Sequence, residues 1–533
     1  MPKLTVANLV DRAARKYGDK PFVHTEQEIV YENIGLDPGK DVYSFSDSLK
    51  ATNMVAAALR DKLGVRPGDR VAVVLTNSLE LGLVFTAITR LGAVFVPFNY
   101  MLKAEEIAKM VNDCGAKVLI TEPELFALNI RDKANVPNIE HWIMVGPRDA
   151  VPAGFLSVDE LAEGLSNAQV EPVELKPMQT AAIFYTSGTT GFPKGAMVTS
   201  RNMIVTTAIS AYTLRLGPKD FCVTALPLAH IFGFDVNVIG GFFTGASGLL
   251  QRFFDPEKTL HYLEKYKATL YTGVPAMYNA MLLFNPEKYD LSNMRYWIAG
   301  ADAMPEDQKK MYEGFGGKFI EGYGMVETAA LISVNIPLLK RAGTVGRPIP
   351  SVRVKVMDEN GEKVGAGDVG EFVVKGPCVM KGYWGDEERT TEAFKYGWLH
   401  TGDMGYKDRL GFLHFVDREK DVIKVGGYSV FSREVEEEIL QNPKVLEVAL
   451  VGVPHPTKRE VPVAVIQLVP GQTATEEELL DWCKQKIAGY KSPRAVKIID
   501  EMPLTMTLKV LKRELRQQLV DEGFFQEDKV RAN

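Results

Sequence analysis

Apolar positions along the first 340 residues alternate between strand-like and helix-like spacing. Residues 70–75 and 93–97 are short β-rich runs, and residues 79–91 between them carry apolar side chains at helical spacing. This order predicts a βαβ unit with parallel strands. The pattern recurs, with strands predicted at 117–121, 181–185, 221–225, 269–271, 295–299 and 318–321, and helices at 200–211, 259–266 and 305–315. The predicted fold class is therefore α/β, with parallel sheets covered by helices.

The pattern changes near Gly343, where short strands replace the alternation. Residues 352–357 and 370–375 flank a turn and predict a hairpin. After the charged segment 417–421, helices at 433–441 and 476–487 and strands at 446–453, 462–469 and 495–499 predict a small α+β domain. We expect an N-terminal domain at 1–418 with a β-rich subdomain at about 343–418, a hinge at 419–422 and a C-terminal lid domain at 423–533. The link lacks a Gly/Ser run, which is typical of a hinge with few torsions.

Composition narrows the class of protein. The 533 residues are 46% hydrophobic and 24% charged, as in a soluble globular protein. A net charge of −6 argues weakly against nucleic acid as a partner. Residues 1–20 suit an amphipathic helix rather than a signal peptide, and the uncharged stretch 236–251 is too short to span a bilayer. The four scattered cysteines predict reduced core thiols, so we expect a cytoplasmic protein. We also expect no stable membrane insertion, and a homodimer stays open.

The most distinctive stretch is residues 185–195, YTSGTTGFPKG, which follows a predicted strand and precedes a predicted helix. Glycines let backbone N–H groups approach a phosphate, hydroxyls donate further hydrogen bonds, and a lysine adds charge. The spacing does not fit GxxxxGK[ST]. The candidate phosphate-binding residues are Thr186, Ser187, Gly188, Thr189, Thr190, Gly191 and Lys194.

This string and several later motifs, in fixed order, resemble the adenylate-forming (AMP-binding) superfamily, in its acyl-CoA synthetase or fatty-acid–CoA ligase branch. The superfamily also contains peptide-synthetase adenylation domains and firefly-type luciferases. The resemblance runs from about residue 20 to 515. It implies a large N-terminal domain that binds ATP and the acid, and a small C-terminal domain that rotates between two half-reactions.

The resemblance also implies the nucleotide contacts. Residues 299–301, AGA, resemble the segment that lines the adenine slot, and residues 322–328, GYGMVET, resemble the G-Y-G-x-T/V-E motif. In that motif the aromatic residue stacks near adenine, Glu327 holds Mg²⁺ and Thr328 touches the α-phosphate; Thr186 is the second metal candidate. The implied contacts are Gly300, Ala301, Glu321, Gly322, Tyr323, Gly324, Met325 and Thr328.

Three further motifs complete the implied machinery. Residues 398–403, WLHTGD, resemble the ribose motif, which assigns Asp403 and Arg418 to the ribose and Lys420 to the hinge. His230 in residues 227–230, PLAH, is implied to lie beside the acyl carboxylate. Lys509 is implied to reach the carboxylate and the α-phosphate, although Leu508 replaces the usual glycine.

The thiol and acid sites are implied as well. The glycine loop at 424–428 and the stretch at 491–494 assign Lys424, Gly426, Gly427, Lys491 and Arg494 to CoA and thioester formation. Ser432 replaces a usual proline but can cap the helix that follows, whose early glutamates are expected to be exposed. The expected acyl pocket consists of Phe234, Val238, Gly241, Val274 and Ala329. Asp235 is expected to be a helix cap or a surface residue.

These residues predict an ATP-dependent, AMP-forming acid–CoA ligase that uses ATP, Mg²⁺ and CoA. An apolar pocket favours a medium-chain, aromatic or alicyclic acid. The alternatives are an adenylating enzyme that loads an amino or aryl acid onto a carrier protein, a luciferase-like oxygenase, and a non-catalytic acyl or nucleotide sensor.

Overall fold

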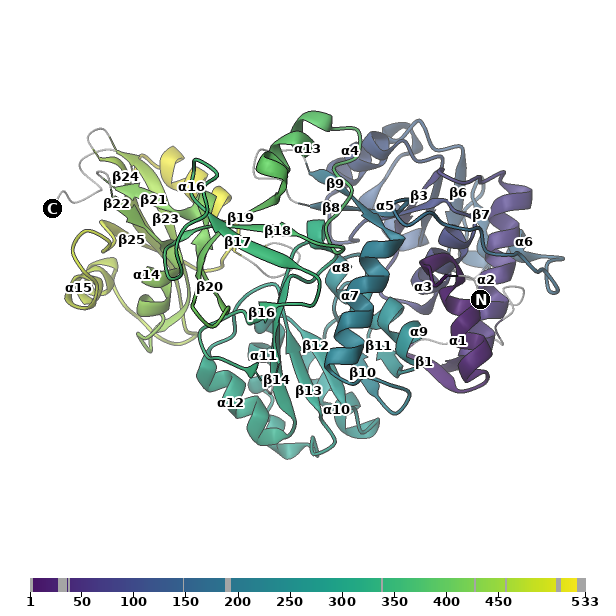
Figure 1. Ribbon diagram of the computed structural model, residues 1–533, viewed down its shortest axis with the longest axis horizontal. Coiled ribbons are helices and arrows are strands. Elements are labelled where there is room, and N and C mark those ends of the chain that lie inside the picture. The colour runs from purple at the N-terminus through teal and green to yellow at the C-terminus, as the bar shows by residue number, and fades with distance from the viewer. Residues whose placement is uncertain are drawn as a thin grey trace. The chain divides into compact units, whose positions relative to one another are not determined.

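The computed structural model (Figure 1) describes residues 3–26, 36, 39–146, 148–186, 193–336, 339–425, 428–455, 458–504 and 510–524. The chain forms two compact units. Unit 1 contains Met1–Arg353 and Val374–Leu399, and unit 2 contains Val354–Val373 and His400–Asn533. The predicted hinge at 419–422 falls within unit 2, and the predicted domain boundaries stay predictions.

Unit 1 contains two large sheets. The seven-stranded sheet has the order β7-β6-β5-β3-β4-β8-β9, and all its pairs are parallel except β8–β9. Its strands are β3 (Arg70–Val74), β4 (Val94–Pro97), β5 (Val118–Thr121), β6 (His141–Met144), β7 (Leu156–Ser157), β8 (Thr180–Thr186) and β9 (Lys194–Thr199).

The nine-stranded sheet has the order β16-β15-β14-β13-β12-β10-β11-β1-β2, with antiparallel strands only at its two ends. Its strands are β1 (Pro21–Thr25), β2 (Val42–Ser44), β10 (Phe221–Thr224), β11 (Ser247–Leu250), β12 (Leu270–Gly273), β13 (Tyr296–Ala299), β14 (Lys318–Tyr323), β15 (Ser333–Asn335) and β16 (Arg347–Pro348).

Helices cover both sheets (Figure 1). The α-helices of unit 1 are α1 (Leu9–Tyr17), α2 (Phe45–Ala57), α3 (Leu79–Arg90), α4 (Ala104–Cys114), α5 (Pro123–Asn129), α6 (Val158–Ala162), α7 (Ser200–Thr213), α8 (Ile231–Phe234), α9 (Gly240–Thr244), α10 (Pro256–Lys265), α11 (Pro275–Leu282), α12 (Glu306–Phe315) and α13 (Glu387–Ala393). The short helical turns used below are η5 (Asp235–Ile239) and η7 (Val326–Thr328).

Unit 2 contains two smaller sheets. A four-stranded sheet, most of which belongs to unit 2, has the order β17 (Arg353–Met357), β18 (Gly370–Lys375), β19 (Leu399–Lys407) and β20 (Leu413–Arg418). The second sheet orders β22 (Tyr428–Val430), β21 (Ile423–Val425), β24 (Arg459–Leu468) and β23 (Val445–His455), and β25 (Ala495–Ile499) pairs with β24. The turn η10 (Glu419–Asp421) and the helices α14 (Ser432–Ile439), α15 (Glu476–Lys486) and α16 (Lys512–Asp521) complete the unit.

The predicted α/β class is confirmed, and the βαβ unit β3–α3–β4 has the predicted parallel pairing. The hydroxyl of Ser78 starts α3 by accepting a hydrogen bond from the Leu81 N–H at 3.3 Å. The rings of Phe85 on α3, Phe95 on β4 and Phe234 on α8 then meet, with centroids 4.7–5.3 Å apart. This aromatic contact joins the seven-stranded sheet to the helix that follows His230.

Two details of unit 2 correct the prediction at Ser432. Its side chain does not cap α14; instead the carboxylate of Asp417 accepts hydrogen bonds from the N–H groups of Ser432 and Arg433. The early glutamates are not all exposed either, because Glu436 pairs with Lys512 at 2.7 Å and accepts from the Leu450 N–H at 2.6 Å. The sequence could not indicate these partners, since they are distant along the chain.

The four cysteines are free, and Cys114, Cys378 and Cys483 are buried, in agreement with the predicted core thiols. Burial raises the pKa of each of these thiols, and of Cys222, to about 12.

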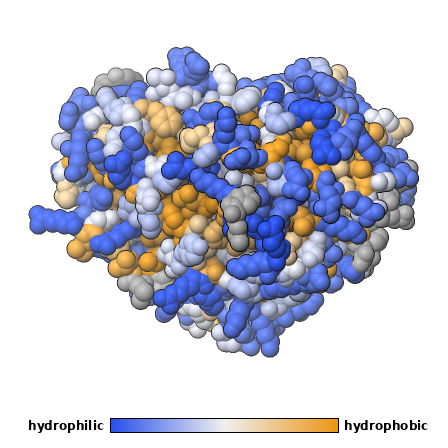
Figure 2. Space-filling view, turned by 45° about the vertical axis from the view of Figure 1, so that its right-hand side comes forward, coloured by the Kyte–Doolittle hydropathy of each residue, from blue (hydrophilic) through white to orange (hydrophobic). Residues whose placement is uncertain are grey.

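Within the described part of the chain, no helix is long and apolar enough to cross a bilayer. On the face drawn in Figure 2, hydrophobic residues lie in patches between hydrophilic ones.

A buried ion pair joins α1 and α3. Both terminal nitrogens of Arg90, whose side chain is 4% exposed, contact the Asp11 carboxylate at 2.7 Å. The Arg90→Met substitution should lower the free energy of unfolding by about 3–5 kcal/mol, because it leaves a partly buried carboxylate without its partner. Denaturant unfolding measures this, and Arg60→Met, in an exposed ion pair, should cost less than about 1 kcal/mol. Equal losses in the two variants would contradict the expectation.

Candidate active site

Most of the site residues predicted in unit 1 follow the carboxyl ends of parallel strands. His230 follows β10, Val274 follows β12 and Gly300 follows β13. Gly322 is the second-to-last residue of β14. The pairs Gly273↔Ala299 and Ala299↔Glu321 are in register, so these strands end side by side. In open α/β sheets this edge is where ligands bind.

The two glycine segments predicted to bind adenine lie on neighbouring strands, β13 and β14. A Cβ atom on Gly300 would lie 3.3 Å from the ring of Phe232, so that ring packs against bare backbone. A Cβ on Gly324 would lie 2.1 Å from the Ala330 carbonyl oxygen, which leaves no room for any side chain. Ala301 has a positive φ of 74°, a conformation that costs free energy outside glycine and is enriched at functional sites.

The predicted metal-binding carboxylate, Glu327, is held by Tyr383. Glu327 is 6% exposed, and its Oε1 accepts a hydrogen bond from the Tyr383 hydroxyl at 2.8 Å. The ammonium of Lys194 lies 5.1 Å from the centroid of the Tyr383 ring. Burial, followed by the nearby Glu327 carboxylate, raises the pKa of Tyr383 well above its ordinary value, so the phenol stays a donor.

Tyr383 reaches Glu327 because the segment 380–384 runs alongside β9. The Met197 N–H donates to the Gly382 carbonyl at 2.9 Å, and the Trp384 N–H donates to the Gly195 carbonyl at 2.8 Å. The Met380 N–H donates to the backbone carbonyl of Glu327 at 2.8 Å. Tyr383 was not predicted, because nothing in its local spacing marks it. The isolated bridge Ala196↔Tyr383 is a long-range pairing.

The phosphate motif lies at a hairpin. Thr186 ends β8, Lys194 begins β9, and these two residues are in register. The strand β9, which was not predicted, therefore lies between the motif and the predicted helix α7. Ser187, Gly188, Thr189, Thr190 and Gly191 lie outside the described residues.

Thr328 of the G-Y-G motif and Glu321, which precedes the motif, both have partners within the protein. The Thr328 hydroxyl donates to the Met325 carbonyl and accepts from the Met325 N–H, both at 3.1 Å. Glu321 turns its carboxylate toward α12, where it pairs with Lys309. The ring of Tyr323 is half-buried.

His230 is the N-cap residue of α8, and its Nδ1 accepts a hydrogen bond from the Phe232 N–H at 3.3 Å. The predicted acyl-pocket residues are largely core residues. Phe234, Val238 and Ala329 belong to the main core cluster, Gly241 packs against the Phe22 ring, and Val274 lies in a small cluster with Ala225, Leu226, Met277 and Phe232.

Unit 2 holds the predicted ribose and thiol residues. Asp403 and Arg418 are in register on β19 and β20, with Nε and Oδ1 3.7 Å apart. Lys420 lies in η10, where burial chiefly lowers its pKa. Lys424 donates to the Ser429 hydroxyl at 2.8 Å, Lys491 pairs with Glu434, and burial lowers the pKa of Arg494. Gly426, Gly427 and Lys509 lie outside the described residues.

Comparison with known proteins assigns the chain to a family. The family model "AMP-binding enzyme" matches residues 10–384, and "AMP-binding enzyme C-terminal domain" matches residues 434–509. The chain belongs to the AMP-binding enzymes. The predicted superfamily and its acyl-CoA synthetase branch are thereby confirmed.

Relatives of this AMP-binding enzyme extend over almost its whole length. It is 33% identical to a long-chain-fatty-acid–CoA ligase of Escherichia coli over 96% of the chain and 94% of that protein. It is 35% identical to a feruloyl-CoA synthase of Amycolatopsis over 90% of the chain and 94% of that protein. The ATP-bound structure of MatB from Rhodopseudomonas palustris matches 97% of the chain and all of that chain with a TM-score of 0.87 and 30% identity. The prediction of an AMP-forming acid–CoA ligase is confirmed at the level of enzyme class.

Asp235 corrects the expectation of a surface residue, because it is buried at the C-terminal end of α8. It is 4% exposed in η5, and its carboxylate accepts a hydrogen bond from the Thr207 hydroxyl at 2.8 Å and a longer one, 3.4 Å, from Thr206. Burial raises its pKa to about 7 against the hydrogen bonds from these two threonines. Its place in an apolar helical stretch gave no sign of the threonines on α7.

This raised pKa makes Asp235 a pH-dependent cost to folding. The folded state binds the proton more tightly than the unfolded state, so the contribution of Asp235 to stability falls as pH rises from about 4 to about 7. Asp235→Asn should therefore gain stability relative to the parent by about 2–3 kcal/mol between pH 5 and pH 8. Denaturant unfolding at the two pH values tests this, and Asp159→Asn, which removes another buried carboxylate, serves as the control. A pH-independent difference between Asp235→Asn and the parent would contradict the assignment.

Proposed function

We propose that this enzyme joins an apolar carboxylic acid to CoA in two steps, through an acyl-adenylate. The arrangement of Glu327, Tyr383 and Lys194 carries the proposal. It sets a fixed buried carboxylate beside the hairpin that contains the phosphate motif and its cation, Lys194. This combination suits a magnesium–nucleotide complex, whose phosphates need positive charge and whose metal needs oxygen ligands.

In the first step the acid oxygen attacks the α-phosphorus of ATP, and pyrophosphate leaves. Because both reactants are anionic, their approach is the main obstacle. Lys194, the backbone of the phosphate motif and Lys509 offset this repulsion, each contributing about 2–4 kcal/mol in a water-poor site. Glu327 and the Thr186 hydroxyl would hold Mg²⁺, which neutralises phosphate charge when bound. Glu327 fits this role because it is buried and oriented by the Tyr383 hydrogen bond.

In the second step the CoA thiol attacks the acyl carbonyl, and AMP leaves. We assign this step to the C-terminal domain after rotation about Lys420, with Lys424, Gly426 and Gly427 at the thiol. Lys491 and Arg494 are assigned to CoA phosphates. Asp403 and Arg418 are assigned to the ribose in both steps, and His230 to the acyl carboxylate.

The substrate class that we favour is an apolar carboxylic acid that carries no amino group. An amino acid needs a carboxylate to meet its amine, but the Asp235 carboxylate is buried and held by Thr206 and Thr207. The side chains assigned to the acid site are apolar, and the small cluster around Val274 includes the ring of Phe232. One relative is named for a long-chain fatty acid and another for a feruloyl thioester, and both names support an apolar or aromatic acid.

The deciding experiment is acid-dependent exchange of labelled pyrophosphate into ATP, with straight-chain, aromatic, alicyclic and amino acids supplied in parallel. We expect exchange well above background with one apolar class and none with amino acids. CoA and an acyl carrier protein are then compared as acceptors with the best acid. Exchange with no acid at all, or preference for an amino acid and a carrier protein, would overturn the proposal.

Tyr383→Phe should reduce kcat/KM for magnesium–ATP by about tenfold, because one oxygen of the buried Glu327 loses its hydrogen-bond donor. The loss in kcat/KM should shrink as the concentration of free Mg²⁺ is raised, because a higher concentration compensates for weaker metal binding by a less ordered carboxylate. Steady-state exchange kinetics at two Mg²⁺ concentrations measure this. Tyr212→Phe, whose ring is 76% exposed, is the matched control and should behave as the parent.

Lys509→Ala should nearly abolish adenylation but still convert supplied acyl-AMP and CoA into acyl-CoA, because the lysine is assigned to the first step alone. Single-turnover assays of the two half-reactions separate these effects. Equal damage to both halves would remove Lys509 from its assigned role.

A further inference from the structure

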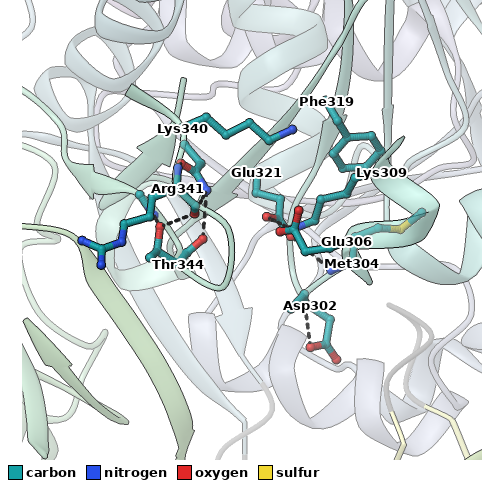
Figure 3. A network of polar contacts seen from close by, with 12 residues as sticks. Asp302, Met304, Glu306, Lys309, Phe319, Glu321, Lys340, Arg341 and Thr344 are labelled. Carbon is teal, nitrogen blue, oxygen red and sulfur yellow. Dashed lines mark hydrogen bonds and ion pairs between the residues drawn. The ribbon is translucent and has the colours of Figure 1, made fainter. Parts of the chain in front are cut away.

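Helix α12 carries a lysine whose charged side chain is buried. The side chain of Lys309 is only 5% exposed, and lysine is almost never buried unless it is paired. Its ammonium contacts two carboxylates, Glu306 one turn earlier on α12 at 2.7 Å and Glu321 on β14 (Figure 3). The neighbouring Lys310 is exposed.

Glu321 links this ion pair to the loop after β13. Its Oε2 pairs with Lys309, while its Oε1 accepts a hydrogen bond from the backbone N–H of Met304 at 3.1 Å. Met304 closes the loop that begins with Gly300 and Ala301, and Glu321 directly precedes Gly322. One carboxylate therefore ties together the two backbone segments assigned to adenine.

We propose that Lys309 is a positioning residue of the nucleotide site, which acts by fixing the Glu321 carboxylate between β14 and the Gly300–Met304 loop. The proposal rests on the proposed function of that site. The adenine slot is assigned to these two backbone segments and the Tyr323 ring, so its width depends on how far the two loops stand apart. On this view the Glu321 side chain shapes the slot from behind and does not contact the nucleotide.

The electrostatics explain why the lysine matters more than its bulk. A buried carboxylate that loses its cation carries a large desolvation penalty, whereas a pair replaced as a whole by neutral groups does not. Without Lys309, the Glu321 carboxylate lowers its free energy by moving toward water. The Met304 N–H then loses its acceptor. The loop after β13 is then released.

A second anchor confines this damage to the loop. Glu313, one turn after Lys309, accepts a hydrogen bond from the Phe319 N–H at 2.9 Å and pairs with Lys340 at 3.0 Å. Phe319 and Glu321 are two residues apart on β14, so α12 is fastened to this strand at two points. Loss of Lys309 leaves the Glu313 anchor in place, and α12 stays on the sheet.

The test compares Lys309→Met with the double variant Lys309→Met/Glu321→Gln. Lys309→Met should weaken AMP binding, measured by titration calorimetry, by about tenfold. The KM for ATP in pyrophosphate exchange should rise in parallel, while the KM for the acid should change by less than about twofold. The double variant should recover affinity to within about threefold of the parent, because the neutral amide that replaces the Glu321 carboxylate can still accept from the Met304 N–H.

Two single variants serve as controls. Lys310→Met changes an exposed lysine on the same helix and should leave AMP affinity unchanged. Lys340→Met breaks the pair with Glu313 without touching the loop, and should affect thermal stability more than AMP affinity.

Three results would overturn the inference: unchanged AMP affinity in Lys309→Met, an equal loss in Lys340→Met, or a double variant no better than the single one. Exchange by the parent enzyme reports separately on the proposed function. AMP calorimetry measures the role of Lys309 even if the parent catalyses no exchange.

Discussion

The carboxyl ends of neighbouring parallel strands must meet at one edge of a sheet, and the candidate active site of this enzyme depends on that constraint. The loops after β10, β12, β13 and β14 are separated by up to about a hundred residues, yet each begins at the same edge. Helices between the strands supply the return path and bury the sheet. The chain can therefore gather backbone N–H groups and charges from distant positions without a dedicated binding domain.

Two buried glutamates at this edge show how the partner decides what a carboxylate does. Glu321 is paired with an ammonium, so its charge is balanced within the protein. Glu327 accepts a hydrogen bond from the neutral hydroxyl of Tyr383, which orients an oxygen without cancelling its charge. The first carboxylate suits a structural role, and the second suits a metal-bound nucleotide.

Local patterns predicted several strands with small errors at their ends, because these strands are short runs rich in apolar residues. β3, β10, β13 and β25 match the predicted segments to within one residue. β9 was missed, since its sequence begins with lysine and glycine and its partner β8 is antiparallel. Tyr383, Lys309 and the buried state of Asp235 could not be predicted, because each depends on a partner from a distant segment that no spacing rule identifies.

The state of the four thiols has a consequence for a reaction that ends in a thioester. An acyl-adenylate reacts with any accessible thiolate, including one that belongs to the protein. Burial raises the pKa of each cysteine far above neutral, so these thiols stay protonated at neutral pH. Self-acylation is thus suppressed, and the activated acyl group is left for an external acceptor.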